Sequence, residues 1–235
     1  MKKSYKKKLI SILVFFISIL LSISYIIANN TEPTNTEENK EKIYYQIKYL
    51  ANELISISNL INNNTNWSSL QKNLERLYNY WNSVILDLNS LNIEKKYLTD
   101  FGKKLDNLTI SIKIQDRQES LNNLIELYKN IIYYAEKLNY NEIYVKIIYA
   151  QYNLLMAYSN VETGNWTLTH EYVLIASENM LNVVNSMEID MYSQYNVNQA
   201  YIALRELENL INIKDLDLFY LKYSIAIEKI KNLSV

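Results

Sequence analysis

Residues 43–61 read IYYQIKYLANELISISNLI, and residues 143–161 read IYVKIIYAQYNLLMAYSNV. Apolar side chains recur in the first stretch at spacings of 4, 3, 4, 3 and 4, and this period lines one face of an α-helix. They are Ile43, Ile47, Leu50, Leu54, Ile57 and Ile61. The positions shifted by 100 are apolar too: Ile143, Ile147, Ala150, Leu154, Ala157 and Val161. The two stretches therefore predict two amphipathic helices at equivalent places in the chain.

An Asn-Trp pair follows each stretch, at Asn66-Trp67 and Asn165-Trp166. We expect each asparagine to cap the next helix, with the indole covering the corner. Three apolar periods follow each pair, and they align between the halves at offsets of 99, 102 and 99 residues. The pattern predicts an all-α body of about eight antiparallel helices, built from a duplicated four-helix unit at residues 41–139 and 140–235. Two packed bundles and one helical-repeat array both fit it.

The composition agrees with an all-α body. The 235 residues include two glycines and one proline, which sheets and tight turns use heavily. The chain has no cysteine, so disulfides, thiolate metal sites and a cysteine nucleophile are excluded.

The N-terminus carries a signal for the membrane. Five lysines lie within residues 1–8, and the run from Leu9 to Ala28 has no charged residue. Its 20 residues match the length of a helix that crosses a bilayer, and the lysines keep the N-terminus in the cytoplasm. Residues 1–28 are thus expected to be a signal anchor or transmembrane segment, and residues 29–40 a polar linker. A cleaved signal peptide with a secreted body is the alternative.

The charge of the body argues against nucleic acid as a partner. Removing the five N-terminal lysines leaves 24 − 5 = 19 basic residues against 25 acidic ones. A mildly acidic body does not offer the basic face that phosphates require.

Catalytic patterns are missing from the sequence. His170 is the single histidine and is expected on a solvated helix face. Zinc-protease, di-iron and phosphate-loop motifs do not occur. We therefore expect no enzyme activity, no metal site and no cofactor. Scattered carboxylates could act only if two of them converged in a cleft.

Aromatic side chains are the candidates for contact with a ligand or partner. Trp67 and Trp166 could form a platform, and Tyr44 and Tyr133, each in a Tyr-Tyr doublet, could line a groove. Packing at helix corners and in the core is the competing interpretation of the same residues.

Trp67, Trp81 and the pair Asp116-Arg117 form a loose layout, and the second half keeps Trp166 but has Met180 for the second tryptophan. This layout resembles uncharacterised membrane-anchored helical domain families (domains of unknown function) of low-GC Gram-positive bacteria. The resemblance implies a location and a fold but no activity.

These observations predict a membrane-tethered, extracytoplasmic helical protein with a non-enzymatic role in contacts with proteins or the cell envelope. A solute- or peptide-binding module with a groove between the two halves is the alternative. An exposed apolar patch would favour the first function, and a closed pocket between the halves the second.

Overall fold

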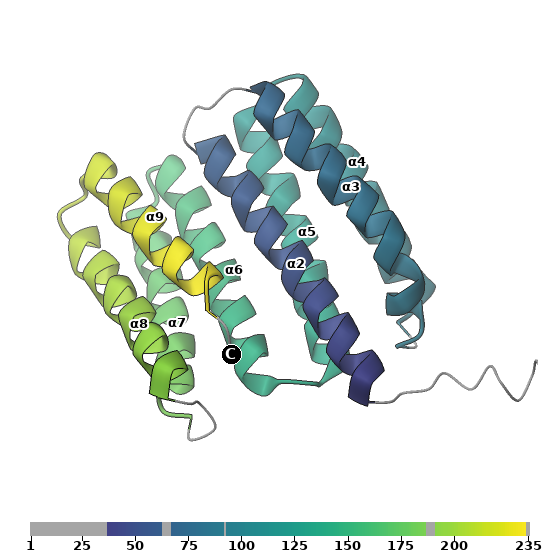
Figure 1. Ribbon diagram of the computed structural model, residues 1–235. Helices are drawn as coiled ribbons and strands as arrows, with labels where there is room; N and C mark the ends of the chain where they lie inside the picture. Colours follow the sequence, from purple (N-terminus) through teal and green to yellow (C-terminus); the bar gives the residue numbers. More distant parts are fainter. Residues whose placement is uncertain (1–36, 63–66, 92, 187–190, 234–235) are drawn as a thin grey trace, which may run out of the picture. The chain divides into compact units, whose positions relative to one another are not determined.

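The computed structural model describes residues 37–62, 67–91, 93–186 and 191–233 (Figure 1). Within these ranges the chain forms eight α-helices and no strand, which confirms the all-α prediction. The helices are α2 (Glu37–Asn62), α3 (Trp67–Asn89), α4 (Lys95–Lys113), α5 (Arg117–Leu138), α6 (Glu142–Glu162), α7 (Trp166–Val184), α8 (Met191–Ile211) and α9 (Leu216–Lys231).

The predicted transmembrane segment, Leu9 to Ala28, lies outside the described residues, as does most of the polar linker. In the ranges that are described, no helix has an apolar run long enough to cross a bilayer. Helix α2 begins at Glu37, inside the linker expected to reach residue 40. Glu37 and Glu38 occupy its first turn, where negative charge complements the positive end of the helix dipole.

The turns before α5 and α9 have the same backbone. Gln115 and Lys214, 99 residues apart, both adopt the left-handed conformation, with φ of 59° and 56°. The next residue caps the helix in each case. Asp116 accepts a hydrogen bond from the backbone N–H of Glu119 at 2.9 Å, and Asp215 accepts one from that of Leu218 at 3.0 Å.

Gly164 ends α6, because its φ of 74° is accessible to glycine at little cost. The N–H of Gly164 donates to the carbonyl of Val161, and that of Asn165 to the carbonyl of Asn160, both at 2.9 Å. This pair of bonds is a Schellman motif. Asn165 then caps α7 by accepting from the N–H of Leu168 at 3.2 Å, as expected. Its counterpart Asn66 lies outside the described residues.

Helices α6 to α9 pack as a closed four-helix bundle, because each is a close neighbour of the next and α6 also lies against α9. Helices α3, α4 and α5 pack in sequence, and α5 joins α6. The expected boundary between the halves, after residue 139, falls in the α5–α6 turn. Residues 40–235 nevertheless form one compact unit, and all packing described below lies within it.

Helix α2 lies between the other helices of the first half and the bundle of α6 to α9 (Figure 1). Its six predicted stripe residues are all buried. Toward α3, the side chain of Asp87 accepts from Lys42 at 2.9 Å and from Gln46 at 2.7 Å. Toward α9, Asn59 donates to Glu228 at 2.6 Å. The Tyr44 ring lies 4.8 Å from that of Tyr144 on α6, so α2 contacts both halves.

The core of the first half contains stacked aromatic rings. Trp81 of α3 lies 4.1 Å from Phe101 of α4 and 6.3 Å from Tyr134 of α5, measured between ring centroids. Ile85, four residues after Trp81, is only half-buried, and Val84 takes the buried position. The cause is the helical period of 3.6, which drifts against a strict spacing of four.

The two glycines should respond oppositely to substitution by alanine. The added Cβ of Gly102→Ala would lie 3.9 Å from the Trp81 Nε1, an ordinary contact, and alanine stabilises a helix interior by about 0.5–1 kcal/mol over glycine. Gly164→Ala has open space but a positive φ, so it should cost roughly 1–2 kcal/mol. Urea denaturation measures both changes. If the free energy of unfolding changed with the same sign in both variants, the turn described at Gly164 would be contradicted.

Candidate functional site

The two predicted tryptophans lie at helix starts. Trp67 opens α3 and Trp166 opens α7, and both are half-buried against the hydrophobic core. The Trp166 ring meets that of Phe219 edge-on, at 6.1 Å and 89°. Among the ring contacts of the described residues, none joins the two indoles. The structure therefore places both rings as corner packing and brings no shared platform together.

The predicted tyrosines differ in their access to solvent. Tyr44 is buried, and burial raises its pKa to about 12. Its neighbour Tyr45 is exposed, as the doublet requires. Tyr133 is half-buried and stacks on Tyr97 at 4.0 Å, with the Lys137 ammonium 5.6 Å from the Tyr133 ring. Tyr44 is thus a core residue, and Tyr133 is the member of the pair that a partner could reach.

A polar cluster joins three helices. Arg117 of α5 donates to the Tyr158 hydroxyl at 2.6 Å and to the Glu162 carboxylate at 3.0 Å, both on α6. Tyr220 of α9 donates to the same carboxylate at 2.7 Å. Burial, and then the Glu162 charge, raise the pKa of Tyr158 well above its usual value. Because the carboxylate has several donors, the cluster serves to hold the helices together.

An open groove of about 350 Å³ lies between α3 and α4. Glu75, Tyr78 and Asp106 line it, together with Gln71, Leu74, Thr109 and Lys113. Both carboxylates are exposed, so the groove does not provide the buried pair that acid–base catalysis would need. His170 is exposed as expected. The described part of the chain contains no cluster of three or more side chains suited to a metal ion.

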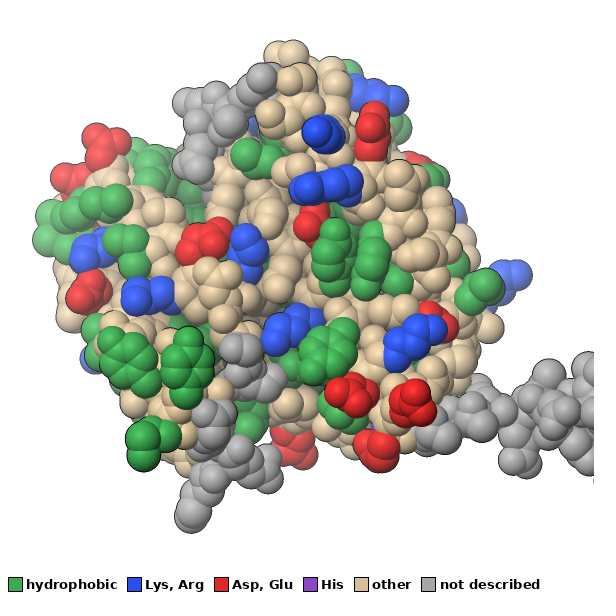
Figure 2. Space-filling view, in the orientation of Figure 1, with side chains coloured by type: hydrophobic (Ala, Val, Ile, Leu, Met, Phe, Trp, Pro, Cys, Tyr) green, Lys and Arg blue, Asp and Glu red, His purple; other side chains and the backbone are tan. Residues whose placement is uncertain are grey.

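Five exposed apolar side chains lie along the outer surface of the last two helices. Met191, Tyr195 and Ile202 follow each other at spacings of 4 and 7 on α8, and Leu221 and Ile225 at a spacing of 4 on α9. All five side chains are exposed, from 91% for Met191 to 38% for Ile225. We call these five residues the α8–α9 face. Figure 2 shows hydrophobic side chains gathered over the lower end of α8.

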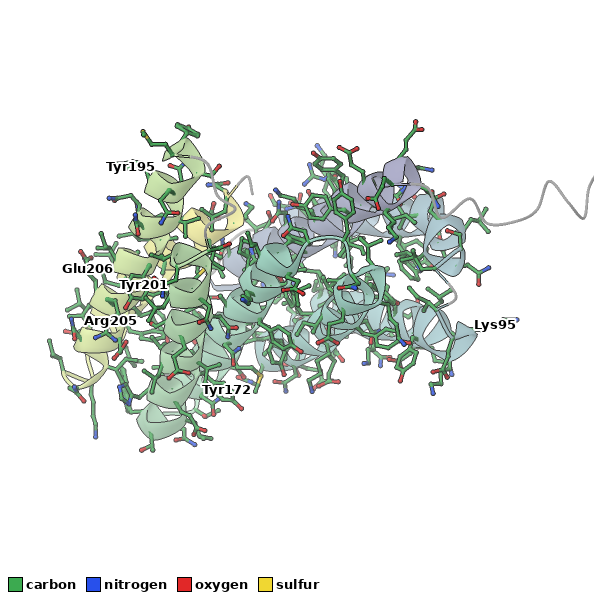
Figure 3. All side chains as sticks on the ribbon, turned by 90° about the horizontal axis from the view of Figure 1, so that it is seen from below. Lys95, Tyr172, Tyr195, Tyr201, Arg205 and Glu206 are labelled. Carbon is green, nitrogen blue, oxygen red and sulfur yellow. The ribbon has the colours of Figure 1, made fainter. Side chains whose placement is uncertain are left out.

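An ion pair shows which residues of α8 and α9 lie at the same level along the two helices. The ammonium of Lys222 on α9 lies 2.6 Å from the carboxylate of Glu206 on α8. Ile202 lies about one turn before Glu206, and Ile225 about one turn after Lys222. Because α8 and α9 are antiparallel neighbours, the two isoleucines lie at the same level. In Figure 3 the labelled Tyr195, Arg205 and Glu206 lie along the outer edge of the second half, far from Lys95 of α4.

Sequence reasoning did not single out the α8–α9 face. An apolar patch that is exposed to solvent and rimmed by charged groups is typical of an interaction site. The signal was present, because Ile202 and Ile225 fall outside the buried stripes that contain Leu207 and Ile227. The Arg117 cluster had no such signal, since Arg117 and Glu162 are 45 residues apart.

Comparisons with protein-family models, curated proteins and solved structures give no match to this chain. The resemblance to the membrane-anchored families therefore stays a prediction, and the function must be argued from the surface itself.

Buried tyrosines should make the fold sensitive to alkali. The pKa values of Tyr44 and Tyr220 are raised to about 12 by burial, and that of Tyr149 to about 12 by its hydrogen bond to Glu136. A raised folded-state pKa means that stability is full below about pH 10 and is lost as the pH rises through 12. Circular dichroism and phenolate absorbance should show unfolding together with ionisation in this window. Ionisation of all tyrosines near pH 10 with an intact fold would contradict the described burial.

Proposed function

We propose that this chain is a membrane-tethered extracytoplasmic protein that acts by docking onto a protein or envelope partner rather than by catalysis. One observation carries the proposal, which is the exposed α8–α9 face. Leaving such side chains in water costs about 25 cal/mol per Å² of apolar area, so a folded protein gains when a partner covers them.

The tether is supported by the sequence. The uncharged run from Leu9 to Ala28 follows five lysines, and this arrangement is typical of an anchor with its N-terminus in the cytoplasm. Secretion after cleavage of this segment remains the alternative location. Residues 29–36 separate it from α2, and eight residues span at most about 3.3–3.6 Å each. A tethered body would therefore stay within a few nanometres of the membrane.

The body is proposed to have arisen by duplication of a four-helix unit. The matched turns at Gln115-Asp116 and Lys214-Asp215 support this origin, because a left-handed residue followed by an aspartate cap recurs at the same offset. The buried stripes support it too: Leu105 and Leu207, at the offset of 102, are both in the core.

The alternative function, a ligand site between the halves, has less support. The groove with the clearest lining, at Tyr78 and Asp106, lies between α3 and α4, inside the first half. Helix α2 and the Arg117 cluster join the first half to the second. Protein contact through the α8–α9 face is therefore the function that we infer.

The location is testable because the chain has no cysteine. His170→Cys adds a thiol on the exposed surface of α7, and Ser4→Cys adds one among the N-terminal lysines. A membrane-impermeant maleimide applied to intact cells should label position 170 at once and position 4 only after lysis. Labelling of position 170 only after lysis would contradict the proposed extracytoplasmic location.

The docking function is testable by crosslinking on membranes. The triple variant Ile202→Asp, Leu221→Asn and Ile225→Glu removes the apolar side chains at exposed positions, where substitutions usually change stability by less than about 0.5 kcal/mol. The triple variant should lose the crosslinked species that the unsubstituted chain forms. Leu86→Asp is the matched control, since Leu86 is exposed on α3 outside the face. Unchanged crosslinks in the triple variant would contradict the proposed function.

A further inference from the structure

We infer that the partner of the α8–α9 face is a second copy of this chain, docked by the same face about a twofold axis parallel to the helices. The inference deepens the proposed function and rests on it. Three independent features lead to it: a comparison of the two halves, the charges around the face, and its size.

At three positions of the face the first half carries polar residues. At the alignment offsets of 102 and 99, Ile202 corresponds to Asp100 and Ile225 to Glu126. Lys104 lies 2.9 Å from the Asp100 carboxylate and 3.5 Å from that of Glu126, so ion pairs occupy this part of the α4–α5 surface. Equivalent helices with the same turns thus differ in their outer surface.

Leu221 follows the same rule, because its counterpart in the first half is the exposed Asn122. Inward positions do not show this change: Leu124 and Tyr223, at the offset of 99, are both buried. At positions 202, 221 and 225 the second half is apolar where the first half is polar, and packing within one copy does not require this difference. A requirement from outside the fold explains it.

The ion pair within the face is compatible with a twofold contact. A twofold contact places the same patch on both sides, so each charge must meet its opposite. A twofold axis parallel to the helices keeps every residue at its level and sets α8 of one copy against α9 of the other. Glu206 and Lys222 lie at one level, as their ion pair shows, so each would face the opposite charge of the second copy. Ile202 would face Ile225 in the same way.

The size of the face fits a small dimer contact. Helix α8 has 21 residues, which is about 31 Å of helix at 1.5 Å per residue. Two helices side by side are roughly 20 Å wide, because packed helix axes lie about 8–10 Å apart and each helix is about 10 Å across. The resulting area is on the order of 600 Å², near the lower range of specific interfaces, which bury about 800 Å² per partner. Tethering both copies to one membrane raises their effective concentration.

The same axis suits two tethered copies. It leaves the start of α2 at the same end of both bodies, so both tethers can enter one membrane. An axis perpendicular to the helices would send the two tethers in opposite directions. Continuation of the helical packing across the axis would form an antiparallel four-helix contact from α8 and α9 of each copy.

The test is disulfide crosslinking of full-length chains in membranes. One tagged chain carries Ile202→Cys, and a second chain with a different tag carries Ile225→Cys. Both are made in the same cells, and oxidation should yield a mixed dimer, because facing side chains can reach the 3.5–4.5 Å Cβ separation of a disulfide. The matched control pairs Asp100→Cys with Glu126→Cys at the equivalent first-half positions. The mixed dimer should exceed the control by about tenfold or more.

A third substitution tests whether the mixed dimer depends on the α8–α9 face. Leu221→Glu in both chains should abolish the mixed dimer while leaving the helical circular dichroism unchanged. Equal crosslinking at the control positions, or no mixed dimer in well-folded membrane protein, would overturn the inference. The mixed dimer could be absent while the variant with all three substitutions of the docking test still loses other crosslinked species. In that case a second copy is not the partner, and the proposed docking function stands. The mixed dimer could also form while the maleimide fails to label position 170 in intact cells. In that case the extracytoplasmic location is wrong and the inferred dimer stands.

Discussion

Burial of α2 is the constraint on which the rest of the body depends. Its apolar stripe has no exposed residue, and its polar side chains reach α3 through Asp87 and α9 through Glu228. Most of the stability of a helix in a protein comes from the packing of its apolar face, so α2 depends on the helices that cover it. Because the two halves share that task, residues 40–235 form one compact unit although the helices follow a repeated pattern.

A second connection lies at the Arg117 cluster, where one carboxylate on α6 accepts from side chains of α5 and α9. Charge-assisted hydrogen bonds of this kind stabilise more than neutral ones and tolerate little change in geometry. Together with the close packing of α6 to α9, the cluster keeps the last hairpin in a fixed position. The α8–α9 face is thus built on helices that pack closely within the bundle, and a preformed surface lowers the entropy cost of docking.

The helices and their caps were predictable because their causes are local. The stripe from Ile43 to Ile61 is buried as its spacing required, and Asp116 and Asn165 cap the helices that they precede. The α8–α9 face was not predicted, and none of the four residues predicted for contact belongs to it. Tyr133 is accessible, whereas Tyr44 is buried by Tyr140 and Tyr144, which are about 100 residues distant in the chain. A period identifies the inward face of a helix but not the neighbour that covers its edge.

The sequence by itself determined the eight described helices, their turns, the absence of cysteine chemistry and the hydrophobic N-terminal run, since each follows from short-range spacing or from composition. Tertiary structure alone decided that α2 lies between the other helices of the first half and the bundle of α6 to α9, that Arg117 meets Glu162, and that Ile202 and Ile225 share one outer surface. The physical reason is that such contacts join side chains far apart in the chain. Their energy depends on which helices become neighbours, and no local period encodes that choice.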